Sequence, residues 1–196
     1  MLKGAKTKTA ILDRATGLAS QVGLTGLTIG VLADDLNLSK SGLFAHFRSK
    51  EALQIEVLNH AAERFRDIVV RPALQQPRGA PRMRALFEGW LAWEHEAALP
   101  GGCVFVAANA ELDDRPGPVR DRLVELQRDW VNTIAVSFTK GVEASLFRPD
   151  VDPAQLAQDL YGIMLSYHLH TRLLGDAGAD GRARRTFDRL LEDITA

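Results

Sequence analysis

The stretch NLSKSGLFAHFRSKEAL (residues 37–53) contains two helix starts on either side of a short helix with little apolar surface to bury. Ser39 and Ser49 are typical helix-capping residues, because a hydroxyl oxygen accepts a hydrogen bond from a free N–H of the first turn. Leu43 and Phe47 are four residues apart and therefore share one helix face. The other positions are mostly small or polar. We therefore expect the outer face of this helix to contact something other than the protein's own core.

The segment before it predicts a second, packed helix. Thr28 is a suitable cap, and apolar residues follow at helical spacing: Ile29, Leu32, Ala33 and Leu36. Asn37 tolerates the left-handed backbone of a tight turn, and we expect Leu38 to fill the gap between the two helices. A helix, a three-residue turn and a short helix within residues 28–47 have the spacing of a helix-turn-helix, whose second helix enters the major groove of DNA.

The rest of the chain also follows helical periodicity, and no strand is expected. The predicted fold is all-α, with about nine helices at approximately 6–22, 28–36, 39–47, 50–71, 82–99, 103–112, 119–144, 153–174 and 182–194. In the fourth helix we expect Leu53, Val57, Ala61, Phe65 and Ile68 to face inward. Three prolines and a glycine in residues 71–81 predict a linker.

Composition limits the class of protein. The chain has 196 residues, a formal net charge of −1 and one cysteine, so no disulfide can form within it. Residues 1–60 carry seven Lys and Arg against five Asp and Glu, whereas the remainder carries 17 against 20. The sign of this asymmetry suits a DNA-binding segment at the N-terminus. No run of 18 apolar residues occurs, so we expect a cytoplasmic protein without a membrane partner.

The segment TIGVLADDLNLSKSGLFAHFRSKEAL (28–53) resembles the DNA-binding domain of the tetracycline-repressor (TetR) family of bacterial transcription regulators. The match extends from about Thr9 to Leu58, and its most specific part is the aromatic-X-His-Phe run at 44–47 followed by Ser-Lys-Glu-X-Leu. The sequence departs from the family pattern where Asn37 replaces glycine and where Phe44 replaces tyrosine. It also departs at Ser41-Gly42, which inverts a frequent order of glycine and hydroxyl residue.

The resemblance implies a DNA-binding face. Thr28, His46 and Lys50 would hold phosphates, Ser39 would cap the second helix, and positions 40–45 would face bases or the adjoining backbone. Phe44 would lack the phosphate-contacting hydroxyl of a tyrosine. The implied DNA-binding set is Thr28, Ser39, Lys40, Ser41, Gly42, Phe44, Ala45, His46 and Lys50.

The resemblance also implies a division of labour: a DNA-binding domain at 1–48, a connecting helix at about 50–71, and a ligand-binding and dimerisation domain at 49–196. Such a regulator binds a palindromic operator in double-stranded DNA as a homodimer, and a small, largely apolar effector releases it. Candidate effector contacts are Phe87, Trp90, Trp93, Cys103, Phe105, Trp130, Phe138, Tyr161, Met164, Tyr167 and His168. Candidate dimer contacts are Tyr161, Leu165, Leu169, Leu173, Phe187, Leu190 and Ile194.

Two alternatives remain open at this point. Glu94-His95-Glu96, flanked by tryptophans, is the one arrangement that suggests an enzyme, but no nucleophile or phosphate-binding loop accompanies it. Cys103 together with the histidines suggests a metal or redox sensor. Residues two apart on a helix, such as His168 and His170, point about 200° away from each other, so they do not chelate one ion. We expect no cofactor, no metal and no enzymatic activity.

Overall fold

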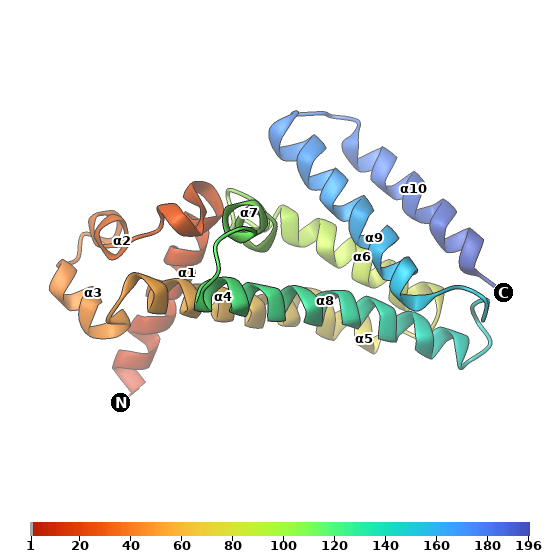
Figure 1. Ribbon diagram of the computed structural model, residues 1–196, viewed down its shortest axis with the longest axis horizontal. Helices are drawn as coiled ribbons and strands as arrows, with labels where there is room; N and C mark the ends of the chain where they lie inside the picture. Colours follow the sequence, from red (N-terminus) through yellow and green to blue (C-terminus); the bar gives the residue numbers. More distant parts are fainter. Residues whose placement is uncertain (1) are drawn as a thin grey trace. The chain divides into compact units, whose positions relative to one another are not determined.

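The computed structural model describes residues 2–196, and side chains from residue 8 onward (Figure 1). Within this part the chain forms nine continuous helical segments, two of which contain a π-helical turn, and an isolated antiparallel bridge joins Phe147 and Thr195. The elements are α1 (Leu2–Gly26), α2 (Ile29–Leu36), α3 (Lys40–Phe47), α4 (Lys50–Phe65), η1 (Arg66–Val70), α5 (Arg71–Gln75), α6 (Ala80–Glu94), α7 (Val104–Leu112), α8 (Pro118–Val142), α9 (Pro153–His168), η2 (Leu169–Leu173) and α10 (Ala179–Ile194). None of the described helices is long and apolar enough to cross a membrane.

The helix starts and stops near the N-terminus follow the predicted residues. Thr28, Ser39 and Ser49 each accept a hydrogen bond from the backbone N–H three residues later, at 3.1, 3.1 and 3.0 Å. Asn37 has a left-handed backbone, with φ 53°. Gly23 (φ 77°, ψ 165°) breaks the helical path of α1, a conformation in which a side chain would be strained. Local sequence signals therefore determine where α1, α2, α3 and α4 begin or end.

The helix that begins with α4 contains a wide, π-helical turn that the sequence did not predict. The N–H of Arg71 bonds to the carbonyl of Arg66, five residues back, immediately before Pro72. Proline has no N–H and its ring crowds the preceding turn, so a wider turn relieves that crowding. The extra residue shifts the register: Val69 is buried and Ile68 only partly so, which makes the prediction for Ile68 wrong.

The linker predicted at residues 71–81 is also wrong. The helix continues through α5 to Gln75, and α6 begins at Ala80, so only a short turn separates them. Proline is compatible with the first turn of a helix, where its missing N–H has no partner to lose. Pro81 is the second residue of α6 and lies at such a start, whereas Pro72 lies inside a continuous helical segment, directly after the wide turn.

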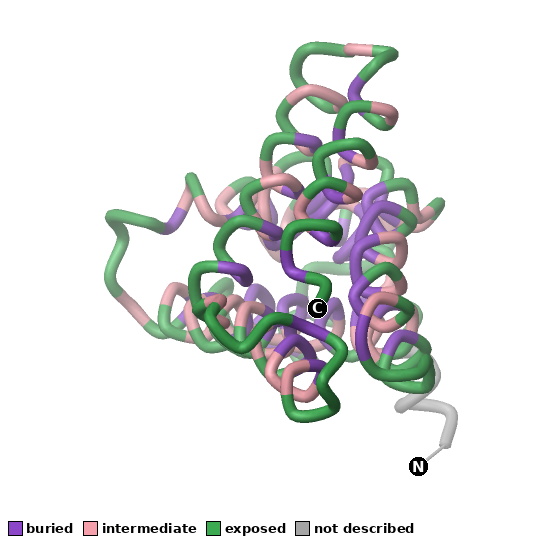
Figure 2. Tube along the Cα trace, turned by 90° about the vertical axis from the view of Figure 1, so that its right-hand side faces the viewer, coloured by how far each residue is buried: buried purple, intermediate pink, exposed green. Residues whose placement is uncertain are grey.

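The chain forms two compact units. The first comprises residues up to Arg64 together with His95–Leu126, and in it α1 packs against α7. The second comprises Phe65–Glu94 and Gln127–Ala196, and in it α9 packs against α6 and α10. Helices in both units carry buried positions between exposed ones (Figure 2). The two units are defined by packing, whereas the predicted boundary at residue 48 separates a DNA-binding domain from a ligand-binding domain. That boundary therefore stays a prediction.

Aromatic side chains fill the core of the second unit. Phe87 stacks on Phe187 with ring centroids 4.2 Å apart, and Phe65 presents its ring to the edges of Trp93 and Trp130 at 5.4 and 4.9 Å. All five are at most 8% exposed. Burying one such side chain contributes roughly 1.5–3 kcal/mol, so this cluster is a main source of stability.

Candidate functional site

Helix α3 is held from one side only. Leu43 and Phe47 are each 1% exposed and anchor it, whereas its other six residues are exposed: Lys40, Ser41, Gly42, Phe44, Ala45 and His46. The prediction that Leu38 fills the gap between α2 and α3 is wrong, because this side chain is 47% exposed. Leu32 of α2 and Leu43 of α3 are buried, at 0% and 1% exposed. The outer face of α3 therefore has no partner within the described chain.

A hollow lies where α2, α3 and α4 begin. Its lining residues are Thr28, Ile29, Gly30, Lys40, Ser41, Phe44 and Lys50. The ammonium of Lys40 lies over the start of α2, where a methyl group built on Gly30 would be 3.6 Å away. Lys50 Nζ donates to the carbonyl of Thr25 at 2.6 Å. Two positive charges beside a helix N-terminus make this hollow suitable for a phosphate group.

The structure thus brings together five of the nine predicted DNA-binding residues around the hollow. Ser39 uses its hydroxyl oxygen as the cap of α3, and Ser41 Oγ donates to it at 3.3 Å. Gly42, Ala45 and His46 lie outside the hollow on the exposed face of α3. Their roles toward DNA remain predictions.

An ion pair fixes α2 on α1. The guanidinium of Arg14 donates two hydrogen bonds to the Asp35 carboxylate, both at 2.6 Å. These hydrogen bonds from Arg14 hold the pKa of Asp35 below its ordinary value. The two residues are 21 positions apart and belong to different helices, and no local sequence signal identified the pair.

This ion pair predicts an acid-dependent loss of stability. A carboxylate whose pKa is lowered on folding stabilises the protein fully above its unfolded pKa of about 3.9, and the stabilisation is lost as the pH falls through the folded value. We expect Asp35→Asn to lower the free energy of unfolding by a few tenths to about 1 kcal/mol at pH 6. The difference from wild type should shrink towards pH 3. Urea unfolding at both pH values measures it, and a difference that grows towards pH 3 would contradict the prediction.

The junction between α1 and α2 also receives contacts from distant helices of the same unit. Glu111, on α7, accepts a hydrogen bond from the N–H of Thr25 at 2.7 Å. Gln54, on α4, donates to the carbonyl of Leu24. These contacts hold the entry to the helix-turn-helix, and because Glu111 lies 86 residues from Thr25, sequence reasoning missed it.

The predicted effector contacts fall into two groups. Cys103 and Phe105 belong to the first unit, and Cys103 is a buried thiol at the start of α7. The other nine belong to the second unit: Phe87, Trp90, Trp93, Trp130, Phe138, Tyr161, Met164, Tyr167 and His168. Within it, Trp90 and Tyr167 meet edge to face with centroids 6.3 Å apart, and burial raises the pKa of the Tyr167 phenol.

Polar groups lie inside this apolar unit. The carboxylate of Glu94, 1% exposed, is 2.8 Å from Nδ1 of His168. The indole N–H of Trp130 is buried and has no hydrogen-bond partner among the described residues. An unpaired buried donor is costly, so it is a site where a bound molecule would gain a hydrogen bond. His168 and Trp130 are among the predicted effector contacts, whereas no pattern in the sequence connects Glu94 with His168, 74 residues away.

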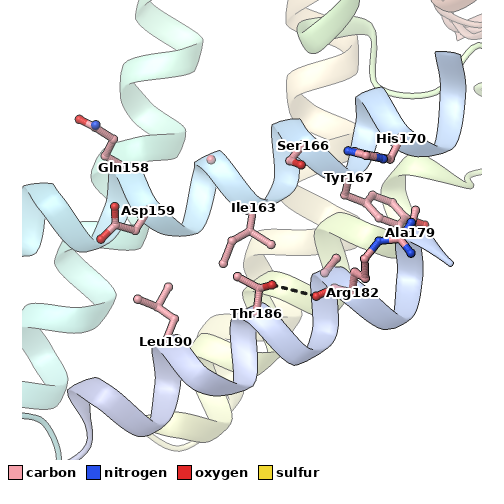
Figure 3. A pocket seen from close by; sticks show the side chains of 12 residues that line it. Gln158, Asp159, Ile163, Ser166, Tyr167, His170, Ala179, Arg182, Thr186 and Leu190 are labelled. Carbon is pink, nitrogen blue, oxygen red and sulfur yellow. Dashed lines mark hydrogen bonds between the residues drawn. The ribbon is translucent and has the colours of Figure 1, made fainter. Parts of the chain in front are cut away.

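The last two long helices enclose a groove. It is lined from both α9 and α10, and its lining residues include Ile163, Ser166, Tyr167, Arg182, Thr186 and Leu190 (Figure 3). Phe187 and Ile194 are 2% and 4% exposed, so the prediction that they contact a second copy is wrong. They belong to the apolar face that α10 turns towards its own unit.

The other predicted dimer contacts are accessible. Leu169 and Leu173 are 46% and 76% exposed, and Tyr161, Leu165 and Leu190 are partly exposed. Tyr161 also donates a hydrogen bond to Gln127 at 2.9 Å.

The histidines proposed for a metal have protein partners. His60 lies 2.8 Å from Asp13, and His170 lies 3.4 Å from Asp176. No cluster of three or more His, Cys, Asp or Glu side chains able to hold a metal ion occurs in the described part of the chain.

Comparison with known proteins agrees with this arrangement. The family profile "Tetracyclin repressor-like, C-terminal domain" matches residues 79–187, and "Bacterial regulatory proteins, tetR family" matches residues 11–57. The HTH-type transcriptional repressor KstR2 of Mycobacterium tuberculosis is 29% identical over 146 residues, which cover 72% of this chain and 70% of KstR2.

Solved structures share the fold. A TetR transcriptional regulator from Chloroflexus aurantiacus superposes with a TM-score of 0.87 at 24% identity, covering 100% of this chain and 99% of that one. AibR, in complex with isovaleryl coenzyme A and operator DNA, superposes with a TM-score of 0.69 at 23% identity, covering 89% and 94%. Since the profiles together match most of the chain, including both the helix-turn-helix and the helical remainder, the chain belongs to the tetracycline-repressor (TetR) family of bacterial regulatory proteins.

Proposed function

We propose that this protein is a ligand-responsive transcriptional repressor that binds a palindromic operator as a homodimer, and not an enzyme. The observation that carries the proposal is the one-sided anchoring of α3, which leaves six of its residues exposed. Three of them, Lys40, Ser41 and Phe44, line a hollow with Lys50 and the start of α2. Small and polar residues let a helix approach the floor of a major groove about 12 Å wide. KstR2 is a repressor, and AibR has been crystallised with operator DNA, which supports the same role here.

In this proposal residues 1–48 form the DNA-binding domain. Helix α3 enters the major groove, Thr28, Lys40 and Lys50 hold one phosphate region, and His46 holds another. Phosphate contacts position the protein, whereas contacts to base edges specify the sequence. Two such domains in a dimer would reach half-sites about 34–36 Å apart, or somewhat more.

The exposed C-terminal end of the α9 segment supports the dimer. Leu169 and Leu173 present apolar side chains at the end of the α9 segment, where a second copy would cover them. We expect the double substitution Leu169→Arg and Leu173→Arg to convert the dimer to a monomer, because charges would be buried unpaired at the contact.

Analytical ultracentrifugation measures this change. The matched control is Leu74→Arg, since Leu74 is 45% exposed on α5 and lies outside the proposed interface. The control should remain dimeric. A dimer that survives the double substitution would contradict the placement of the interface.

The effector would bind among the aromatic residues of the second unit, within the proposed ligand-binding and dimerisation domain at 49–196. The unpaired indole N–H of Trp130 and the Glu94–His168 pair are the polar groups available there, so we infer a largely apolar molecule with at least one hydrogen-bond acceptor. Its binding would release DNA if it prefers a conformation whose two DNA-binding domains no longer match the operator.

The proposal is tested with a duplex from the region upstream of the protein's own gene. At low ionic strength we expect nanomolar to micromolar binding, protection of a two-fold symmetric site, and affinity that falls steeply with salt. If the folded dimer protects no such duplex, the repressor assignment fails. Catalytic turnover by the folded protein without DNA binding would favour the enzyme alternative.

A further inference from the structure

The outer face of α3 carries few groups that can read a base by hydrogen bonds. Bases are distinguished in the major groove by Arg or Lys on guanine, Asn or Gln on adenine, Asp or Glu on cytosine, and apolar contact with the methyl group of thymine. Among the exposed residues of α3 only Lys40, Ser41 and His46 are polar. The helix has no Arg, Asn, Gln, Asp or Glu.

Two of the three polar side chains are already directed elsewhere, and the third lies late in the helix. The Lys40 ammonium lies over the start of α2 beside Gly30, and Ser41 Oγ donates to Ser39 at 3.3 Å. His46 belongs to the last turn of α3, whereas a recognition helix contacts base edges with its N-terminal residues. Hydrogen-bonded readout from this helix is therefore weak.

Phe44 remains as the large exposed group in the centre of the helix. It is 55% exposed and is the one phenylalanine among the large exposed hydrophobic side chains of the described chain. It lines the hollow with Lys40 and Lys50, and the methyl group of Ala45 is exposed next to it. The positive charges of Lys40 and Lys50 make DNA the partner that fits this apolar surface.

We propose that Phe44, assisted by Ala45, contacts the C5-methyl group of a thymine in each operator half-site, so that sequence is read largely through thymine methyl groups. This inference rests on the proposed function. The C5-methyl stands at the base edge nearest its own sugar–phosphate strand, so a ring between phosphate-binding lysines and the groove reaches it. Apolar contact with this methyl separates thymine from cytosine, which lacks it.

The test uses a duplex that the protein itself selects from a random library, amplified either with dTTP or with dUTP. The second product has the same base sequence without thymine methyl groups. For wild type we expect the Kd to rise about 4-fold for each lost methyl contact, and about 15-fold when both half-sites lose one. The Phe44→Ala variant should lose most of this preference, because the ring is gone and only the smaller contact of Ala45 with the methyl group remains.

Two further variants complete the design. Phe44→Tyr keeps the ring and should keep the preference for methylated duplex. Leu74→Ala truncates a comparably exposed apolar side chain on α5 and should behave as wild type. If wild type binds the two duplexes equally, or if Phe44→Ala retains the full wild-type preference, the inference is overturned while the proposed function stands. If selection enriches no sequence, the proposed function fails and this inference with it.

Discussion

Replacing Lys40 and Lys50 together by glutamine is expected to raise the Kd for operator DNA on the order of 1,000-fold at low salt. Both ammonium groups lie at the hollow beside the start of α2, and a dimer would lose four of them. A contact between a charged donor and a phosphate contributes about 1 kcal/mol or more, so four contacts account for about 4 kcal/mol. Glutamine keeps a hydrogen-bond donor, which preserves a partner for the carbonyl that Lys50 now contacts.

Salt dependence distinguishes this loss from a general loss of folding. Each phosphate contact contributes a slope of about −0.9 to a plot of log K against log salt, so the slope should flatten by about 3.6. The loss should be similar for specific and unrelated duplexes, since phosphate contacts carry no sequence information. Lys140→Gln is the control, because Lys140 lies on α8 in the other unit and is paired with Glu143, directly after the end of that helix. An unchanged slope in the double variant would contradict the assignment of this face.

The helix-turn-helix was predictable because its determinants are local. Thr28, Ser39 and Ser49 cap helices through hydrogen bonds that span three residues, and Asn37 supplies the left-handed turn within the same stretch. Short-range hydrogen bonds of this kind depend on neighbouring residue types and little else. The order and number of the helices were predictable for the same reason.

What sequence reasoning missed depends on contacts between distant segments. Glu94 and His168 are 74 residues apart, and Arg14 and Asp35 belong to different helices, so no periodic pattern connects them. The π-turn before Pro72 shifts the inward face of the helix by one residue, so that Val69 is buried in place of Ile68.

Orientation errors have a related cause. Periodicity identifies an apolar face of a helix without saying which neighbour that face covers. Phe187 and Ile194 lie on the apolar face of α10 but turn towards their own unit. Leu38 is exposed, whereas Leu32 and Leu43 are the buried leucines of α2 and α3.

Replacing Gly101 by alanine is expected to lower the free energy of unfolding by about 3 kcal/mol or more. A methyl group built on Gly101 would lie 1.7 Å from the carbonyl oxygen of Ser20. The backbone N–H of Gly101 also donates a hydrogen bond to Ser20 Oγ at 2.9 Å. Two backbone segments must therefore separate, which removes packing between α1 and the chain entering α7. Overpacking of this kind typically costs 1–3 kcal/mol, and backbone against backbone lies at the upper end because neither segment can rotate away.

For a chain of this length such a loss lowers Tm by about 10 °C, which thermal unfolding followed by circular dichroism measures. Gly181→Ala is the matched control, because a methyl group there would meet only the mobile guanidinium of Arg185, at 3.2 Å. Since alanine also has the higher helix propensity, Tm of the control should stay the same or rise slightly. A Tm for Gly101→Ala within about 2 °C of wild type, which corresponds to less than about 1 kcal/mol, would mean that α1 does not need this close approach. The seating of α1, and with it the helix-turn-helix, would then depend mainly on side-chain contacts such as that between Glu111 and Thr25.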